Sequence, residues 1–123
     1  MRRVLIVDDE PVVADTLRLI FEKNGFEAQS VYSADEAMLC AESFAPELML
    51  CDINMPEKDG VELIAAMNQG YPSCRILVLT GAYGSIARVR EFAAKLKRQL
   101  PILAKPCAPS DLLREAGNLL LTA

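Results

Sequence analysis

The sequence predicts a doubly wound α/β domain made of five repeats of a strand followed by a helix. Short, continuous apolar runs at 4–7, 48–51 and 76–79 are typical of strands that are buried on both faces. Segments with apolar residues at helical spacing separate these runs, and crossovers of that length join parallel strands. We therefore expect one domain, residues 1–123, with a parallel sheet and helices on both of its faces.

The first repeat runs from the strand at 4–7, which ends in acidic residues, to a helix that begins at Pro11. The helix is expected to end at Asn24-Gly25, because glycine adopts the left-handed conformation of a C-terminal stop at little cost. The residues that recur at helical spacing are Val12, Val13, Thr16, Leu17, Ile20 and Phe21.

The second repeat begins with 26–31, where polar and apolar residues alternate as they do in an edge strand. Ser33 and Glu36 have the spacing of a capping box, in which the two side chains bond reciprocally to backbone amides at the start of a helix. This predicts a helix over about 34–43.

The remaining repeats are read in the same way. Asp52 directly follows the apolar run at 48–51, and a turn at Asp59-Gly60 leads into a third helix that ends near Gly70. The other expected elements are a strand at 76–79 ending on Thr80, a helix at 86–96, a short strand at 102–104 ending on Lys105, and a last helix at 109–120.

Charge is unevenly distributed along the chain. The net charge is −4, which argues against general nucleic-acid binding by the whole surface. Residues 85–105 nevertheless carry about +5, with a basic outer face predicted on the helix at 86–96. This face is the first place to look for an acidic partner, although a solvated face explains the same pattern.

The sequence has four scattered cysteines and no histidine, so a zinc site is not expected. No apolar stretch has the length of a membrane span or of a secretion signal. We expect a cytoplasmic protein whose cysteines remain thiols. Any chemistry that needs an imidazole must come from another molecule.

Polar side chains follow four of the predicted strands at their carboxyl ends, namely Asp8 with Asp9, Asp52, Thr80 and Lys105. In a parallel sheet these ends converge on one crevice, so three carboxylates should meet a hydroxyl and an ammonium group. Carboxylates about 4 Å apart repel by roughly 4 kcal/mol at an effective dielectric of about 20, so the cluster calls for a cation. Hard oxygen ligands favour Mg²⁺.

With Mg²⁺ bound, Asp52 is a plausible nucleophile toward a phosphoryl group and would give an aspartyl phosphate. Lys105 would neutralise phosphoryl oxygens as a point charge, and the Thr80 hydroxyl would donate to one of them.

These motifs resemble the receiver domain of bacterial two-component response regulators, most closely the single-domain chemotaxis type. The resemblance covers the whole chain and rests on four segments at their intervals: Val-Asp-Asp-Glu at 7–10, Cys-Asp-Ile-Asn-Met-Pro-Glu-Lys-Asp-Gly at 51–60, Leu-Thr-Gly-Ala at 79–82 and Ala-Lys-Pro at 104–106. It implies a flavodoxin-like, five-stranded parallel sheet of strand order 2-1-3-4-5 with five helices.

The resemblance also implies functional roles. Asp52 would be the phosphoacceptor, Thr80 and Lys105 would sense the phosphoryl group, Asp9 and the backbone carbonyl of Asn54 would bind Mg²⁺ together with Asp52, and Asp8 would help through a water molecule. A sensor histidine kinase or a histidine phosphotransfer protein would be the donor. The surface of the fourth helix, fifth strand and fifth helix would bind an output protein or a second copy, without direct nucleic-acid or membrane binding.

Two departures from the family pattern keep alternatives open. Ile102 stands where receivers usually carry Tyr or Phe, and Cys107 stands where Phe is common. One alternative is therefore a binding module of receiver fold that acts without phosphorylation. Another is a turnover phosphatase, which is disfavoured because Asn54 stands where such enzymes usually carry a second Asp. We expect a phosphoacceptor domain rather than an enzyme.

Overall fold

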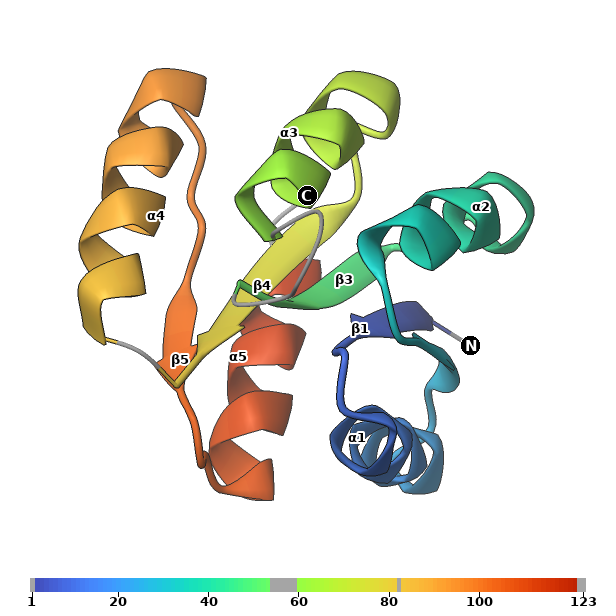
Figure 1. Cartoon of the computed structure of the whole chain (residues 1–123). Coiled ribbons are helices and arrows are strands. Elements are labelled where there is room, and N and C mark those ends of the chain that lie inside the picture. Colours follow the sequence, from blue (N-terminus) through green and yellow to red (C-terminus); the bar gives the residue numbers. More distant parts are fainter. Residues whose placement is uncertain (1, 54–59, 82, 122–123) are drawn as a thin grey trace.

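The structure, a computed structural model, describes residues 2–53, 60–81 and 83–121. Five parallel strands form one sheet in the order β2-β1-β3-β4-β5, as expected (Figure 1). The elements are β1 Arg3–Val7, α1 Pro11–Lys23, β2 Glu27–Val31, α2 Ala34–Phe44, β3 Leu48–Asp52, α3 Gly60–Gly70, β4 Arg75–Thr80, α4 Tyr83–Leu96, β5 Ile102–Ala104 and α5 Pro109–Leu121. The doubly wound α/β class is confirmed.

The helices cover both faces of the sheet. Successive side chains of a strand point to opposite faces, so Leu48 and Leu50 of β3 pack with α1 and α5. Met49 and Cys51 of the same strand pack with α2, α3 and α4 on the other face. Figure 1 shows α1 and α5 together on one side of the strands. Two apolar cores therefore hold the central strands from both sides.

The central strands are buried, as their continuous apolar runs predicted. Every residue of β3 is buried, and only the first residue of β1 and of β4 is partly exposed. By contrast β2 lies at the edge of the sheet, in agreement with its alternating sequence.

Local signals at helix ends are mostly confirmed. Gly25 follows α1 with a φ of +90°, and the Ser33 side chain accepts a hydrogen bond from the Glu36 backbone N–H at 3.1 Å. The reciprocal half of the capping box differs from the expectation. The Glu36 carboxylate accepts from the backbone N–H of Tyr32 at 3.0 Å, one residue before the N-cap, and from the Ser33 hydroxyl at 3.2 Å.

The first helix differs from its sequence pattern in which side chains are buried. Phe21 is fully buried as expected, but Val12 is 79% exposed and Thr16 is also exposed. The apolar stripe of α1 is therefore wider than the face that packs on the sheet.

All four cysteines lie among the described residues and are thiols, as expected. Of the helices in the described part of the chain, none combines the length and the apolar character needed to cross a membrane.

Candidate functional site

An acidic cluster lies at the carboxyl edge of the sheet, where β1 and β3 end. Asp8, Asp9 and Asp52 each offer a carboxylate oxygen within 4.8 Å of those of the other two. Asp8 and Asp52 are almost fully buried, with 1% and 4% exposure, whereas Asp9 is half-buried. The strand ends thus bring together the three carboxylates that the sequence placed there.

Lys105 follows β5 and brings its ammonium group to this cluster. Its Nζ lies 2.7 Å from Oδ2 of Asp8 and 3.3 Å from Oδ2 of Asp52. Partial burial disfavours the charged form, but the hydrogen bond to Asp8 and the charges of Asp52 and Asp8 outweigh this effect and raise the pKa of Lys105. The side chain is therefore a fixed cation at the site at physiological pH.

Thr80 is the last residue of β4 and is 1% exposed. The sheet register pairs Asp52 with Leu79 and Thr80 with Ala104, so Thr80 lies one residue beyond Asp52 and beside the residue that precedes Lys105. The backbone N–H of Lys105 donates to the Thr80 carbonyl at 2.8 Å. A backbone hydrogen bond therefore joins Thr80 and Lys105 at the same edge of the sheet as Asp52.

Gly60, the first residue of α3, lies directly against the end of β3. A Cβ atom at this position would lie 2.6 Å from Cα of Ile53 and 2.7 Å from the carbonyl oxygen of Asp52. The backbone N–H of Gly60 also donates to the Ile53 carbonyl at 3.2 Å. The absence of a side chain at Gly60 therefore lets the chain return close to Asp52.

The charge balance of the cluster fits a divalent cation. Three carboxylates face one ammonium group, and each carboxylate pair repels by about 3.5 kcal/mol at an effective dielectric of about 20. Oxygen ligands of this kind, with one position half-exposed, suit Mg²⁺. The cluster is therefore typical of a magnesium site. The predicted ligand Asn54 lies outside the described residues.

Two features of the site escaped the sequence analysis. The first is the pairing of Asp8, whose Oδ2 lies directly against Lys105 and whose Oδ1 accepts from the backbone N–H of Glu10 at 3.0 Å. The expected role of Asp8 toward Mg²⁺ through a water molecule stays a prediction. The sequence indicated that Asp8 lies at the site, because it follows a strand. It could not indicate that Asp8 pairs with Lys105, because that pairing depends on side-chain geometry.

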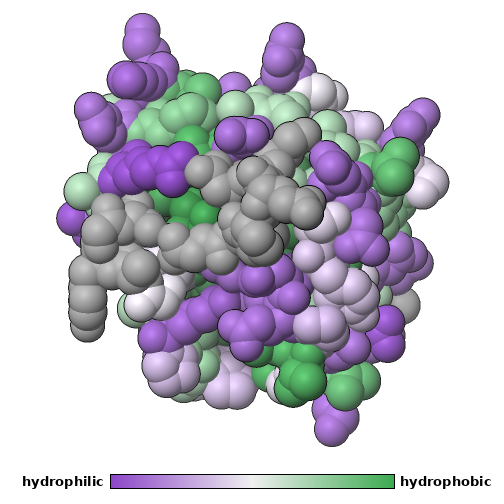
Figure 2. Space-filling view, in the orientation of Figure 1, coloured by the Kyte–Doolittle hydropathy of each residue, from purple (hydrophilic) through white to green (hydrophobic). Residues whose placement is uncertain are grey.

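The second missed feature is an apolar pocket of about 560 Å³ beside the site, between α1 and the segment that leads into α5. Val12, which is 79% exposed, and Lys105 both form part of its wall. Figure 2 shows hydrophobic residues at the lower edge of the molecule, where Figure 1 places α1. The remaining lining residues are Val13, Thr16, Leu17, Ile20, Leu79, Pro106, Cys107 and Pro109.

Comparisons with known proteins agree with this geometry. A family model described as response regulator receiver domain matches residues 4–116. A protein-glutamate methylesterase/protein-glutamine glutaminase of Hahella chejuensis is 34% identical over 97% of this chain and 35% of its own length. The crystal structure of a CheY-like response regulator receiver domain protein from Methanospirillum hungatei superimposes with a TM-score of 0.88 at 28% identity, over 98% of this chain and 94% of that one.

Vibrio cholerae CheY4 shares the fold, with a TM-score of 0.87 at 24% identity over 97% of this chain and 98% of that one. The chain spans 35% to 59% of the length of eight curated relatives that it matches. Receiver domains of the matched family act in two-component signalling as phosphoacceptors rather than as classical enzymes, and such a domain implies a histidine kinase as donor. The family match over most of the sequence, together with the acidic cluster at the sheet edge, shows that the chain belongs to the response regulator receiver domain family.

Proposed function

We propose that Asp52 accepts a phosphoryl group from a phosphohistidine and that residues 1–123 act as one receiver domain that this modification switches. The observation that carries the proposal is the position of Asp52. Its carboxylate ends a fully buried strand, lies within 4.8 Å of two other carboxylates, and is 3.3 Å from the Lys105 ammonium group.

In the proposed step an Oδ atom of Asp52 forms a bond to phosphorus while the bond from phosphorus to the donor imidazole nitrogen breaks. The electron pair of that bond leaves with the imidazole, which takes up a proton from solvent. Lys105 stabilises the phosphoryl oxygens by its charge, and the Thr80 hydroxyl donates a hydrogen bond to one of them.

A magnesium ion fits the carboxylate set, with Asp9, Asp52 and the backbone carbonyl of Asn54 as protein ligands and Asp8 acting through water. When bound, it would neutralise charge on the transferred group. The site's own residues then provide the nucleophile and the remaining electrostatic stabilisation.

The assignment is tested by phosphorylation with a small phosphodonor in the presence of Mg²⁺, followed by electrophoresis that separates the phosphorylated form. We expect incorporation into the parent protein and none into Asp52→Asn. Asp111→Asn, the same change at an exposed helix start, is the matched control and should incorporate normally. Equal labelling of Asp52→Asn would contradict the assignment.

The apolar pocket beside α1 supports a docking position for the donor protein. Val12 is exposed at the pocket and Lys105 links the pocket to Asp52, so a helix packed in it would bring its histidine next to the carboxylate. We propose that the donor binds here mainly through apolar contacts.

The output surface is proposed to be formed by α4, β5 and α5. Ile102, which replaces the usual aromatic residue, is half-buried and packs on the same core as Phe92 and Leu96 of α4. A change at Thr80 would reach α4 through this shared core, and the exposed Arg88, Arg90 and Lys95 would face the partner or a second copy.

The alternative function is that of a binding module that acts without phosphorylation. Ile102, which stands where receivers usually carry an aromatic residue, favours this alternative. Beryllofluoride with Mg²⁺, which mimics the aspartyl phosphate, separates the two functions. A change in dimerisation or partner affinity supports the switch, and an unchanged affinity supports the binding module.

A further inference from the structure

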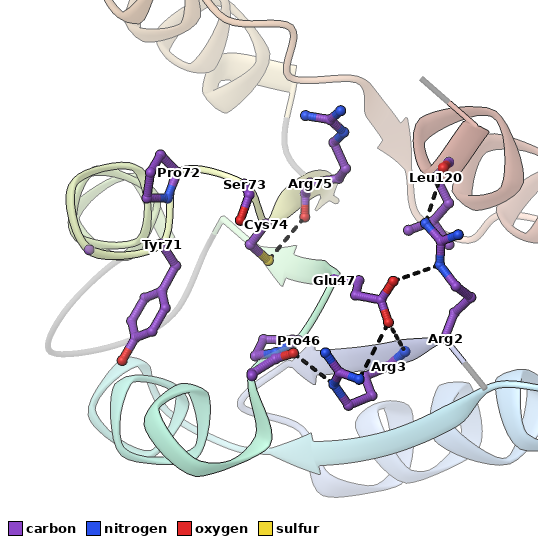
Figure 3. A pocket seen from close by; sticks show the side chains of 12 residues that line it. Arg2, Arg3, Pro46, Glu47, Tyr71, Pro72, Ser73, Cys74, Arg75 and Leu120 are labelled. Carbon is purple, nitrogen blue, oxygen red and sulfur yellow. Dashed lines mark hydrogen bonds and ion pairs between the residues drawn. The ribbon is translucent and has the colours of Figure 1, made fainter. Parts of the chain in front are cut away.

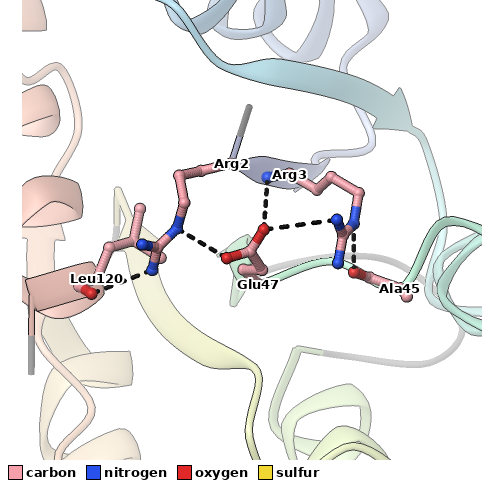
Figure 4. Close-up of polar contacts among 5 residues, drawn as sticks. All are labelled: Arg2, Arg3, Ala45, Glu47 and Leu120. Carbon is pink, nitrogen blue, oxygen red and sulfur yellow. Dashed lines mark hydrogen bonds and ion pairs between the residues drawn. The ribbon is translucent and has the colours of Figure 1, made fainter. Parts of the chain in front are cut away.

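Arginine side chains tie helix ends to the amino edge of the sheet, where β1, β3 and β4 begin (Figure 3). Arg2 and Arg3 both bind the carboxylate of Glu47, at 2.7 and 3.6 Å (Figure 4). Arg2 also donates to the Leu120 carbonyl, in the last turn of α5, at 3.1 Å. Arg3 donates to the carbonyl of Ala45, which follows α2, at 2.8 Å. The carboxyl ends of α2 and α5 are thus attached to the start of β1.

Arg98 makes a similar attachment for α4, from the segment that joins this helix to β5. Its guanidinium group donates to the side chain of Asn68 on α3 at 3.0 Å and to the carbonyl of Cys74, the residue before β4. Arg98 is half-buried, and burial is the main cause that lowers its pKa. The guanidinium group is therefore partly removed from water and bound to acceptors on two different segments.

The backbone around Arg98 fixes the same end of α4. Lys97 follows the helix in the left-handed conformation, with a φ of +54°, and its N–H donates to the carbonyl of Ala94 at 3.2 Å. The N–H of Arg98 donates to the Ala93 carbonyl at 3.2 Å, which completes a Schellman motif. Leu100, two residues later, is buried in the core. Because this conformation costs a lysine more than a glycine, contacts such as those of Arg98 are needed to hold the turn.

The rest of α4 is packed less firmly than this end. In the part of α4 whose side chains the structure describes, residues 86–96, only Val89 is buried. By contrast α3, which packs on the same core, buries four residues. The first turn of α4 follows the end of β4, where Thr80 lies at the carboxyl edge beside the phosphorylation site proposed above (Figure 1). The helix therefore reaches from that site to the amino edge, where Arg98 anchors it.

We propose that Arg98 is the pivot of α4. Its guanidinium group holds the carboxyl end of the helix to α3 and β4, so a change at Thr80 displaces the amino end of the helix and with it the exposed Arg90. The inference rests on the proposed phosphorylation switch and states how that switch reaches the output surface. A helix that is attached firmly at one end and packed weakly along its length turns about the attached end, because this movement keeps the bonds of Arg98 and disturbs few buried contacts.

The test is NMR of the protein in Mg²⁺, with and without beryllofluoride, read at the backbone amides. In the parent protein we expect beryllofluoride to change the chemical shifts of residues 87–90 more than those of residues 94–97, because the helix is fixed near its carboxyl end. The amides of Asp52 and Thr80 report separately whether beryllofluoride has acted at the site.

Arg98→Gln should extend the beryllofluoride changes to residues 94–97, because the pivot is lost. Without beryllofluoride, amide hydrogen exchange at 94–97 should become about ten-fold faster in this variant, because hydrogen bonds of a charged group are lost and local opening becomes easier. Asn68→Ala removes one acceptor and keeps the arginine, so it should show both effects at smaller size. Arg90→Gln, the same charge change at an exposed position of α4, should behave as the parent protein does.

Thermal melting checks the fold of each variant, and Asn68→Ala carries the test if Arg98→Gln unfolds. An even change along α4 in the parent protein overturns the pivot. So does faster exchange in Arg98→Gln or Asn68→Ala without a spread of the beryllofluoride changes, because that result leaves Arg98 a purely structural role. If the amides of Asp52 and Thr80 do not respond in the parent protein, the proposed function fails and the pivot with it, whereas a response there with an even change along α4 rejects the pivot alone.

Discussion

Asp52 carries opposing electrostatic interactions that can be compared in magnitude. Asp8 and Asp9 each repel it by about 3.5 kcal/mol, while Lys105 at 3.3 Å attracts it by about 5 kcal/mol, all at an effective dielectric of about 20. Repulsion therefore exceeds attraction by about 2 kcal/mol. A bound divalent cation would offset this repulsion.

We predict that Asp52→Asn raises the free energy of unfolding by about 1 to 2 kcal/mol in buffer without divalent ions. Millimolar Mg²⁺ should reduce this advantage, because binding to the native parent protein adds stability by mass action. Urea unfolding with and without Mg²⁺ measures both effects.

Asp111→Asn is the control for this prediction, since it removes only an exposed pair with Arg114 and should change stability by less than about 0.5 kcal/mol. A variant Asp52→Asn that is less stable than the parent in EDTA would contradict the electrostatic argument.

The buried thiol of Cys74 makes the stability of the fold depend on pH in the alkaline range. Burial raises the pKa of its thiol to about 11, from an ordinary value of 9. Between these two values the folded chain binds more protons at this group than the unfolded chain, so stability falls as pH rises from about 9 to about 11. The full loss attributable to Cys74 is about 2 to 3 kcal/mol.

We predict that Cys74→Ala weakens this alkaline loss, although the variant is less stable at neutral pH because it leaves a small cavity. The measurement is the urea midpoint of unfolding at several pH values, and the slope of the midpoint against pH is compared between the parent and each variant. Cys107→Ala, at a half-buried thiol, should keep most of the parent slope. Identical slopes for Cys74→Ala and the parent would count against the assignment.

Among single residues, those whose location depends on strand position could be predicted from the sequence. Asp8, Asp52 and Thr80 follow strands that were recognisable as apolar runs, and parallel strands bring their carboxyl ends to one edge. The direct pair between Lys105 and Asp8 could not be predicted, because a long side chain can reach either carboxylate and only the folded geometry selects one.

At the scale of elements, the junction of β3 and α3 depends on Gly60. The sequence indicated a turn there, but it gave no sign that residue 60 lies against the backbone of Asp52 and Ile53, since that contact forms only after the chain returns. A methyl group at this position would meet backbone atoms that cannot move aside.

We predict that Gly60→Ala lowers the free energy of unfolding by about 1 to 3 kcal/mol through overpacking, and that it also slows phosphorylation by a small donor because the end of β3 shifts. Gly117→Ala is the matched control in α5, where a Cβ would meet nothing within 4 Å. It should be neutral or stabilising by up to about 1 kcal/mol. Equal stabilities of the two variants would contradict this account.

The helix α1 marks the limit of pattern-based prediction for elements. Its position and ends followed from Pro11 and Gly25, but helical spacing does not distinguish an apolar residue that packs on the sheet from one that faces solvent. Val12 belongs to the residues that recur at helical spacing, yet it is exposed and lies at the apolar pocket. The one indication in the sequence was the width of the apolar stripe of α1, which is broader than the face that packs on the sheet.

At the scale of the whole molecule, the parallel fold separates two kinds of charge. All strands run in one direction, so the carboxyl edge collects Asp8, Asp9 and Asp52 while the amino edge collects Arg2, Arg3 and Arg75. A donor protein that approaches the carboxyl edge meets acidic groups, which repel other anions. The docking position proposed above assigns the affinity of the donor largely to apolar contact with the pocket beside α1.

This separation predicts different responses to protein donors and to small donors. Val12→Asp places a charge in the apolar pocket without touching the carboxylates, so transfer from a phosphorylated histidine phosphotransfer domain should slow by about ten-fold or more as the burial of Val12 is lost. Incorporation from a small phosphodonor should stay unchanged. Leu39→Asp makes the same kind of change at a site on α2 that is 73% exposed, and both rates should remain normal. If Val12→Asp slows both donors equally, the effect arises at Asp52 itself and the pocket is not the docking surface.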